Sequence, residues 1–211
     1  MVYRLSRALI RLVLRVACGF RVEGGEHEPP TGPLLIVSNH VSDLDPLVVG
    51  VTLRRPTHFM AKEELFRPPL LRWWITACGG FPVRRGEPDR GAFRTARAIL
   101  ERGGALGMFP EGTRGSSLRD LRPPEPGAAL LALRTGATIL PVAVIGTDVV
   151  LPRGASRPRR GTIRVRVGAP IRVDGAGNPP VRTRADRERI DALGQMYMGV
   201  IARLLGGSGG P

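Results

Sequence analysis

From Pro33 onward the chain alternates short apolar runs with amphipathic stretches of helical period. Such runs form buried strands, and the amphipathic stretches between them form the helices that cover a sheet. We therefore expect an α/β fold with a central, largely parallel mixed sheet flanked by helices. Pro82 has no N–H to donate, so its strand is expected at an edge of the sheet. The strands are expected at 33–38, 57–61, 81–83, 105–109, 137–145 and 162–167, and the helices at 44–53, 69–77, 90–102, 127–134 and 185–205.

The chain has 211 residues and 42% hydrophobic content, which is enough for one domain with a buried core. No internal repeat or interior change of composition indicates a second domain. We expect an amphipathic helix over 1–20, a single domain over 21–205 and a disordered tail over 206–211. The stretch 151–161 is expected to be an exposed loop, and 175–180 a linker.

The first 20 residues have the pattern of an amphipathic helix. Arg4, Arg7, Arg11 and Arg15 recur every three or four positions. They interrupt the apolar run too often for a secretory signal or a spanning helix, which needs about 20 largely uncharged residues. The apolar side consists of Leu5, Leu9, Leu12, Val13 and Val16. Two interpretations stay open: a helix lying in a bilayer interface beside anionic headgroups, or a surface helix that covers the core.

The chain is strongly basic, with 32 Lys and Arg residues against 18 Asp and Glu residues and a net charge of +14. This balance favours a polyanionic partner, either a nucleic acid or an anionic membrane surface. Aromatic residues make up 5% of the chain, and no nucleic-acid-binding motif is present. A non-catalytic nucleic-acid-binding protein is therefore kept only as a remote alternative. Trp73 and Trp74 are candidates for an interfacial anchor or for core packing.

A histidine and an aspartate follow the first of these strands at a spacing that suits general-base chemistry. His40 and Asp45 are separated by a short polar turn. An aspartate there can accept a hydrogen bond from one imidazole nitrogen, which leaves the other free to take a proton from a hydroxyl. The alternative is that His40 is a surface residue and that Asp43 or Asp45 caps the next helix.

Two further strand ends carry groups that suit a phosphate. They are Glu111, Gly112, Thr113 and Arg114 after one strand, and Arg84 and Arg85 after another. Glycine lets the backbone approach a ligand, hydroxyl and guanidinium groups donate to phosphate, and a carboxylate can hold a substrate hydroxyl. Each segment could also be a solvated turn. Because ligands of open α/β sheets bind at the carboxyl ends of strands, the three loops together predict one site.

In this order and separation, the motifs resemble those of the lysophospholipid acyltransferase family, typified by 1-acyl-sn-glycerol-3-phosphate acyltransferases. The His-x4-Asp block is matched at 39–46 and the Pro-Glu-Gly-Thr-Arg block at 109–114. Looser matches are a Lys-Glu-Leu-Phe-like step at 61–66, a Gly-x5-Arg block at 79–85 and a hydrophobic-proline block at 139–143. Gly115 stands where members of the family usually carry serine.

The resemblance implies an enzyme that transfers a fatty acyl group from acyl-CoA or acyl carrier protein to the free hydroxyl of a lysophospholipid. The expected acceptor is 1-acyl-sn-glycerol 3-phosphate, which gives phosphatidic acid in phospholipid biosynthesis. Glycerol 3-phosphate, a lyso-ornithine lipid or a glycolipid stays open as the acceptor, because acceptor selectivity depends on pocket shape. No metal or bound cofactor is expected, and neither is a nucleic-acid partner. A peripheral location on the cytoplasmic face of the cell membrane is expected.

The resemblance also implies roles for the motif residues. His40 is the expected general base, and Asp45 orients it. The expected substrate-binding residues are Arg85, Glu111, Gly112, Thr113 and Arg114, and the weaker candidates are Asn39, Lys62 and Arg84. The choice between the two neighbouring arginines for the acceptor phosphate stays open, as does the role of the arginines between 153 and 166.

Overall fold

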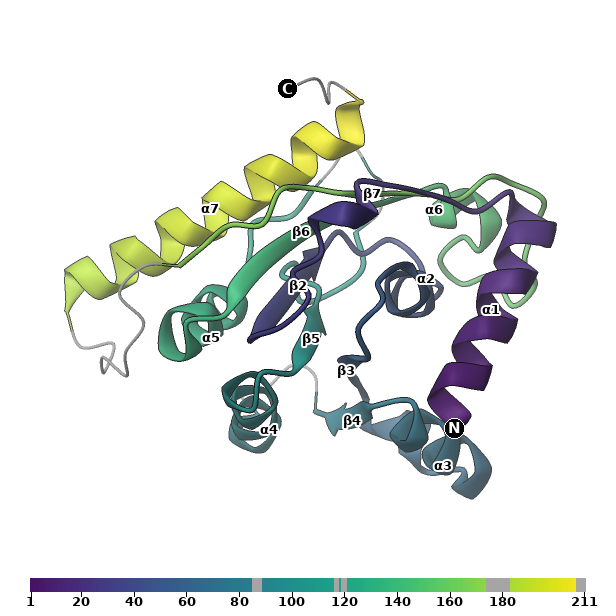
Figure 1. Cartoon of the computed structure of the whole chain (residues 1–211), viewed down its shortest axis with the longest axis horizontal. Helices are drawn as coiled ribbons and strands as arrows, with labels where there is room; N and C mark the ends of the chain where they lie inside the picture. Colours follow the sequence, from purple (N-terminus) through teal and green to yellow (C-terminus); the bar gives the residue numbers. More distant parts are fainter. Residues whose placement is uncertain (85–88, 116–117, 119–120, 174–182, 208–211) are drawn as a thin grey trace.

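The computed structural model describes residues 1–84, 89–115, 118, 121–173 and 183–207. Its strands are β1 (Arg21–Glu23), β2 (Leu34–Ser38), β3 (Thr57–Lys62), β4 (Gly80–Val83), β5 (Ala105–Met108), β6 (Thr138–Ile145) and β7 (Arg164–Val167). Its helices are α1 (Val2–Cys18), α2 (Asp45–Thr52), α3 (Pro69–Ala77), α4 (Arg90–Glu101), α5 (Pro126–Thr135), α6 (Thr147–Val150) and α7 (Arg184–Gly206), with 3-10 turns η1 (Gly25–His27) and η2 (Glu63–Phe66). These elements form one sheet with helices around it (Figure 1).

The sheet of the described residues has seven strands in the order β1-β7-β6-β2-β5-β3-β4 (Figure 1). Neighbouring strands pair in parallel, except that β6 and β7 are antiparallel. The predicted α/β class and largely parallel mixed sheet are therefore confirmed. β2 lies between β5 and β6, so the loops that follow these three strands meet at one edge of the sheet.

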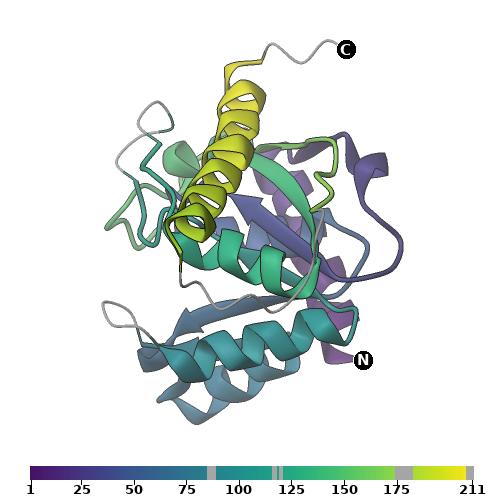
Figure 2. The same ribbon diagram turned by 90° about the vertical axis from the view of Figure 1, so that its left-hand side faces the viewer.

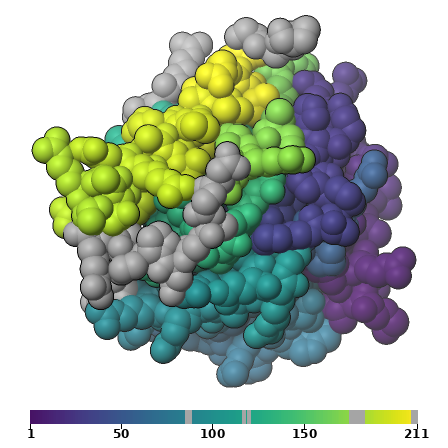
Figure 3. Space-filling model, turned by 60° about the vertical axis from the view of Figure 1, so that its left-hand side comes forward, coloured from purple at the N-terminus to yellow at the C-terminus, as the bar shows by residue number. Residues whose placement is uncertain are grey.

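β2 supplies side chains to the apolar clusters on both faces of the sheet. Leu34 and Ile36 belong to the cluster that includes side chains of α1 and α2, whereas Leu35 and Val37 belong to the cluster that includes side chains of α4, α5 and α7. This alternation follows from the two-residue period of a strand. Figure 2 shows that α4, α5 and α7 cover one face of the sheet. In Figure 3, atoms of α4 and α7 occupy much of the molecular surface on this side.

The ends of two helices follow from local capping groups. The Asp89 carboxylate accepts hydrogen bonds from the N–H groups of Gly91 and Ala92 and so begins α4. Thr183 and Asp186 exchange side-chain and backbone hydrogen bonds in a capping box that begins α7. These contacts satisfy N–H groups that have no partner within the helix.

The predicted strands and helices are found within a few residues of their expected bounds, and β4 lies at an edge as Pro82 predicted. β1 and α6 are not predicted by the sequence pattern, because β1 is three residues long with a single apolar side chain and α6 has only four residues. The predicted linker at 175–180 lies outside the described residues. Of the predicted tail, Gly206 is the last residue of α7 and Gly207 is also described, whereas 208–211 are not.

α1 exposes the apolar side that its sequence pattern defines. Leu5, Leu9, Leu12, Val13 and Val16 have exposed fractions of 53–81%. A different face holds the helix to the domain: Ile10, Leu14 and Cys18 pack into an apolar cluster. The interpretation that the predicted apolar side covers the core is therefore wrong for this helix. Across the described chain, every helix is too short or too polar to traverse a bilayer.

The two tryptophans of α3 have different surroundings. Trp73 is 57% exposed, so core packing is excluded for this side chain. Trp74 is half-buried, and its indole N–H donates to the hydroxyl of Ser6 in α1 over 3.1 Å. Trp74 therefore joins α3 to α1.

Candidate active site

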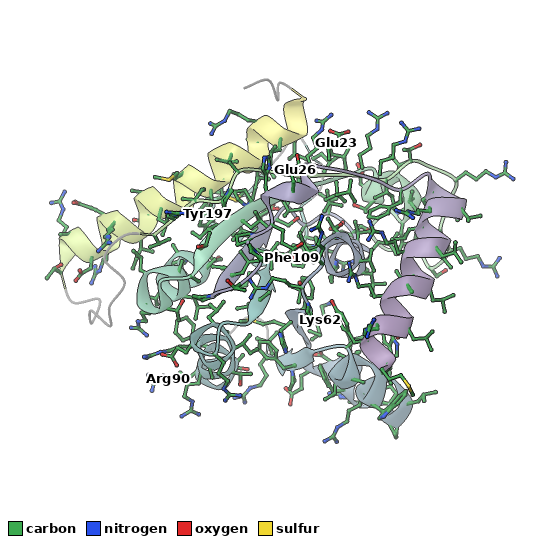
Figure 4. The ribbon with its side chains drawn as sticks, in the orientation of Figure 1. Glu23, Glu26, Lys62, Arg90, Phe109 and Tyr197 are labelled. Atoms are coloured by element: carbon green, nitrogen blue, oxygen red, sulfur yellow. The ribbon has the colours of Figure 1, made fainter. Side chains whose placement is uncertain are left out.

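The turn after β2 brings His40 against Asp45. The two residues are 3% and 0% exposed, and His40 Nδ1 lies 2.9 Å from Asp45 Oδ2. Because a carboxylate accepts hydrogen bonds, this contact places the imidazole proton on Nδ1 and leaves Nε2 as a proton acceptor. The ring also stacks on Phe109, with 4.2 Å between ring centroids. Phe109 follows β5, is half-buried and packs against the apolar cluster around β2 (Figure 4 labels it).

The Asp45 carboxylate is buried and held by four donors. Oδ2 accepts from His40 and from the backbone N–H groups of Val41 and Ser42, both over 2.7 Å. Oδ1 accepts from the hydroxyl of Thr147 over 2.6 Å. A buried charge is tolerated when its hydrogen bonds are satisfied in this way. Asp45 thus closes the turn as well as holding the imidazole.

Neither aspartate of this turn serves as the N-cap of α2. The N-cap residue is Leu44, and Asp45 is the first residue of the helix. Asp43 instead accepts a hydrogen bond from the Arg114 guanidinium over 2.5 Å. The alternative in which these carboxylates are plain helix caps is therefore wrong.

Asn39 connects the same turn to β6. Its amide N–H donates to the carbonyl of Val144 over 2.9 Å, and its amide oxygen accepts from the N–H of Val144 over 2.8 Å. Asn39 is fully buried. Both ends of the amide are used to fix the backbone that leads into His40.

Glu111 holds the backbone of His40. Its Oε1 accepts from the His40 N–H over 2.9 Å, and its Oε2 accepts from the Arg122 N–H over 3.2 Å. The carbonyl of His40 accepts in turn from the N–H of Gly115 over 2.7 Å. Burial raises the pKa of Glu111, and the backbone hydrogen bonds oppose this rise. The loop after β5 is therefore hydrogen-bonded to both the N–H and the carbonyl of His40.

The other members of this loop lie nearer the surface. Gly112 has φ of +69°, a value that favours glycine, and it is exposed. Thr113 and Arg114 are half-buried. The ion pair between Arg114 and Asp43 joins the loop after β5 to the loop after β2, with side-chain exposed fractions of 18% and 67%. Arg114 is thus placed beside the histidine turn, as expected for two loops that follow the carboxyl ends of neighbouring parallel strands.

A largely apolar cavity of about 480 Å³ begins at this pair of loops. Its lining at the site is His40, Asp43, Lys62 and Arg114, and its lining near α1 and α3 includes Tyr3, Ser6, Trp74 and Cys78. The cavity follows β3, because both Thr57 at the start of that strand and Lys62 at its end line it. Thr57 also donates its N–H to the hydroxyl of Tyr3 in α1. Six residues of β3 span about 17 Å at about 3.3 Å per residue. The side chain of Lys62 lies at the carboxyl end of β3 (Figure 4).

Lys62 and Arg84, at the ends of the paired strands β3 and β4, line different hollows. Lys62 lines the cavity that reaches His40, whereas Arg84 lines another hollow together with Glu63. Arg84 is exposed, with its guanidinium 3.9 Å from the carboxylate of Asp89. Arg85 lies outside the described residues.

The contacts of Ser42, Phe109 and Thr147 were not predicted from the sequence. Ser42 donates its hydroxyl to the carbonyl of Leu151 over 2.7 Å. Phe109 was part of a recognised motif, but its stacking on an imidazole leaves no trace in spacing. Thr147 follows β6, so the rule that sites gather at the carboxyl ends of parallel strands could have found it. Within the described ranges, no three His, Cys, Asp or Glu side chains gather as metal ligands would.

A family model described as Acyltransferase matches residues 19–145, which is more than half of the chain. The chain belongs to the Acyltransferase family. This region includes the histidine turn and the loop after β5, so the resemblance predicted from the motifs is confirmed. The site and its hydrogen bonds are therefore built largely from the part of the chain that defines the family.

Curated members of the Acyltransferase family that resemble this chain bear the name 1-acyl-sn-glycerol-3-phosphate acyltransferase. The protein from Borreliella burgdorferi is 33% identical over 148 residues, which cover 68% of this chain and 58% of that protein. The chloroplast protein of Arabidopsis thaliana is 30% identical over 71% of this chain and 43% of its own length. The protein from Bacillus subtilis is 27% identical over 86% of this chain and 88% of its own length. The chain thus spans about half the length of the first two relatives.

The fold is similar to the crystal structure of the 1-acyl-sn-glycerophosphate (LPA) acyltransferase PlsC from Thermotoga maritima, with a TM-score of 0.79. The match covers 97% of this chain and 78% of that chain at 24% sequence identity. At this identity the likeness establishes a shared fold.

The hydrogen bonds of Glu111 to the backbone predict that its replacement destabilises the fold. Glu111→Ala leaves two backbone N–H groups without their acceptor, so we expect the free energy of unfolding to fall by about 1 to 3 kcal/mol. Glu26 is exposed, and Glu26→Ala should change the free energy of unfolding by less than about 0.5 kcal/mol. Urea unfolding followed by circular dichroism measures both. Equal effects of the two substitutions would contradict a structural role for Glu111.

Proposed function

We propose that the protein transfers a fatty acyl group from a thioester, carried by coenzyme A or acyl carrier protein, to the free hydroxyl of a lysophospholipid. The proposed acceptor is 1-acyl-sn-glycerol 3-phosphate, and the product is phosphatidic acid in phospholipid biosynthesis. The observation that carries this proposal is the buried pair of His40 and Asp45 at one end of a long apolar cavity. The names of the relatives support the same chemistry.

In this reaction His40 is the general base. Its Nε2 takes the proton of the acceptor hydroxyl as that oxygen attacks the thioester carbonyl, and the Asp45 carboxylate stabilises the imidazolium that forms. The tetrahedral intermediate then collapses, the carbon–sulfur bond breaks, and the imidazolium returns the proton to the departing thiolate. The nucleophile belongs to the substrate, so the protein forms no acyl intermediate, and no metal or bound cofactor takes part.

The cavity suits the acyl chain of the donor. It is largely apolar and is lined by residues from both ends of β3, and a volume of about 480 Å³ lies in the usual range for a ligand pocket. A fatty chain in this space would place its thioester carbonyl beside His40 and its methyl end near Trp74 and Cys78. Burial of the chain away from water would then supply binding energy in proportion to its length.

The charged end of the cavity suits the phosphate of the acceptor. Lys62 and Arg114 both line it, and Arg114 would exchange the exposed carboxylate of Asp43 for the phosphate. Arg85 stays a predicted phosphate ligand, and Thr113 and Gly112 stay predicted contacts of the glycerol portion. Glu111 would act mainly through the backbone of His40, because both of its oxygens accept backbone hydrogen bonds.

Turnover by the purified protein tests this function directly. With an acyl-CoA donor we expect lysophosphatidic acid to be acylated faster than glycerol 3-phosphate, a lyso-ornithine lipid or a glycolipid. His40→Ala should lower kcat by about 10²- to 10⁴-fold, because general-base assistance is lost. His27→Ala, whose ring contacts the carbonyl of Val167, is the matched control and should keep its activity.

Two results would contradict this proposal. Full turnover by a folded His40→Ala protein would exclude the mechanism, and faster acylation of another acceptor in the panel would replace the substrate. A salt-dependent gel shift with defined nucleic acid, which we do not expect, would support the nucleic-acid alternative.

The role of the cavity predicts a change in chain-length preference. Cys78→Phe adds bulk inside the cavity, so kcat/KM for a long-chain acyl-CoA should fall about 10- to 100-fold, while that for a short-chain acyl-CoA stays near the parent value. Thr76→Phe adds similar bulk two residues away, outside the cavity lining, and should change neither value. A uniform loss for all chain lengths would contradict the assignment of the cavity to the acyl chain.

The membrane is the proposed site of action. α1 exposes its apolar face, and Arg4 and Arg15 are exposed on the same helix. The neighbouring α3 adds the exposed side chains of Leu70 and Trp73. Such surfaces bind in the interface of a bilayer with anionic headgroups. We propose a peripheral location on the cytoplasmic face of the cell membrane.

Liposome flotation tests this location. Replacing Leu5, Leu9 and Leu12 together by Ser should weaken binding to vesicles that contain anionic lipid by at least about 10-fold, because apolar burial is lost. Met196 on α7 is similarly exposed at 54%, and Met196→Ser should bind as the parent does. Binding that survives the triple substitution or ignores the anionic lipid content would contradict the proposal.

A further inference from the structure

The segment after β6 contacts the histidine turn through two buried or partly buried hydroxyl groups. Thr147, the first residue of α6, donates its Oγ1 to Asp45 Oδ1 over 2.6 Å. Ser42, inside the turn, donates its Oγ to the carbonyl of Leu151 over 2.7 Å. The partners are 102 and 109 residues apart in the sequence. Only the fold brings them together.

The chain path at the end of β6 determines where the Thr147 hydroxyl lies. Gly146 has φ of +90°, and a Cβ atom there would be 2.0 Å from the carbonyl oxygen of Thr162. The chain can therefore turn sharply from β6 into α6 only with glycine at this position. This turn leaves Thr147 fully buried, with its side chain against Asp45.

The carboxylate of Asp45 needs this partner to keep its orientation. The torsion that rotates an aspartate carboxylate is soft, so hydrogen bonds rather than rotamer preference set its plane. Oδ2 has three donors, whereas Thr147 is the donor that the described residues show for Oδ1. Without this hydroxyl, Oδ1 would be buried and unpaired, and rotation of the carboxylate to find another donor would disturb the bond from Oδ2 to His40.

We propose that Thr147 is a positioning residue of the acyl transfer. Its hydroxyl fixes the plane of the Asp45 carboxylate so that Oδ2 accepts from His40 Nδ1, which keeps Nε2 ready to accept the proton of the acceptor. Thr147 does not line the cavity and acts only through Asp45. The kinetic part of this inference rests on the proposed acyl transfer.

The test compares Thr147→Val, which keeps the shape but removes the hydroxyl, with Thr147→Ser, which keeps the hydroxyl. Thr147→Val should lower kcat about 10- to 100-fold and leave KM for the acyl-CoA and for lysophosphatidic acid within about twofold. Thr147→Ser should restore kcat to within about threefold of the parent. Thr52→Val removes another buried hydroxyl, one that bonds the carbonyl of Val48 in α2, and should leave kcat unchanged. If Thr147→Val does not fold, Thr147→Ala takes its place with the same expected loss.

A double substitution shows whether Thr147 acts through Asp45. Asp45→Ala alone and Asp45→Ala combined with Thr147→Val should have the same kcat, because without the carboxylate the Thr147 hydroxyl has nothing left to orient. Independent, multiplying losses would overturn the proposal. So would a folded Thr147→Val protein with the kcat of the parent, or a Thr147→Ser protein impaired as much as Thr147→Val.

A spectroscopic measurement separates this inference from the proposed function. The chain has three histidines, so ¹⁵N spectra of histidine-labelled protein can resolve the tautomer of His40 without any substrate. At a pH where the ring is neutral, the parent and Thr147→Ser should carry the proton on Nδ1, and Thr147→Val should show a mixture. If the parent acylates no acceptor but the tautomers behave as expected, the function fails and the positioning role stands. An unchanged tautomer in Thr147→Val would overturn the positioning role.

Discussion

The buried carboxylate of Asp45 is the interaction on which the site depends. A charge without solvent must find all its hydrogen bonds inside the protein, and Asp45 draws them from the imidazole, from two backbone N–H groups of its own turn and from the Thr147 hydroxyl. These donors come from loops that follow β2 and β6. The site can therefore form only when both strands have been placed side by side in the sheet.

The central position of β2 explains why groups at the ends of three strands meet around His40. β5 and β6 pair with β2 on its two sides, and all three strands run parallel. Their carboxyl ends therefore bring the loops after them to one place. The loop after β2 carries His40, and the loop after β5 contacts its backbone through Glu111 and Gly115. Val144 near the end of β6 holds Asn39, and Thr147 just after β6 holds Asp45. The backbone of the histidine is fixed before any substrate arrives, which is what general-base catalysis requires.

The same sheet connects the chemistry to the surface that would meet a lipid. β3 forms one wall of the apolar cavity, and its amino end contacts Tyr3 in α1. α1 therefore has two roles in the fold: one face lines the cavity, and another, apolar face is open to solvent. A lipid chain in this cavity would thus end beneath the helix that is proposed to lie in the membrane interface.

The sequence by itself determined the α/β class and most element bounds, because apolar periodicity acts within a few residues along the chain. The short spacing of His40 and Asp45 suggested their pairing, but only the structure excluded the helix-cap alternative. The sequence also identified the apolar side of α1, but not that this side faces solvent, since that depends on how Ile10, Leu14 and Cys18 pack. Only the tertiary structure determined the hydrogen bond of Glu111 to the backbone of His40 and the hydrogen bond of Thr147 to Asp45. These partners lie 71 and 102 residues apart, and pairing of β2 with β5 and β6 is what brings them within hydrogen-bond distance.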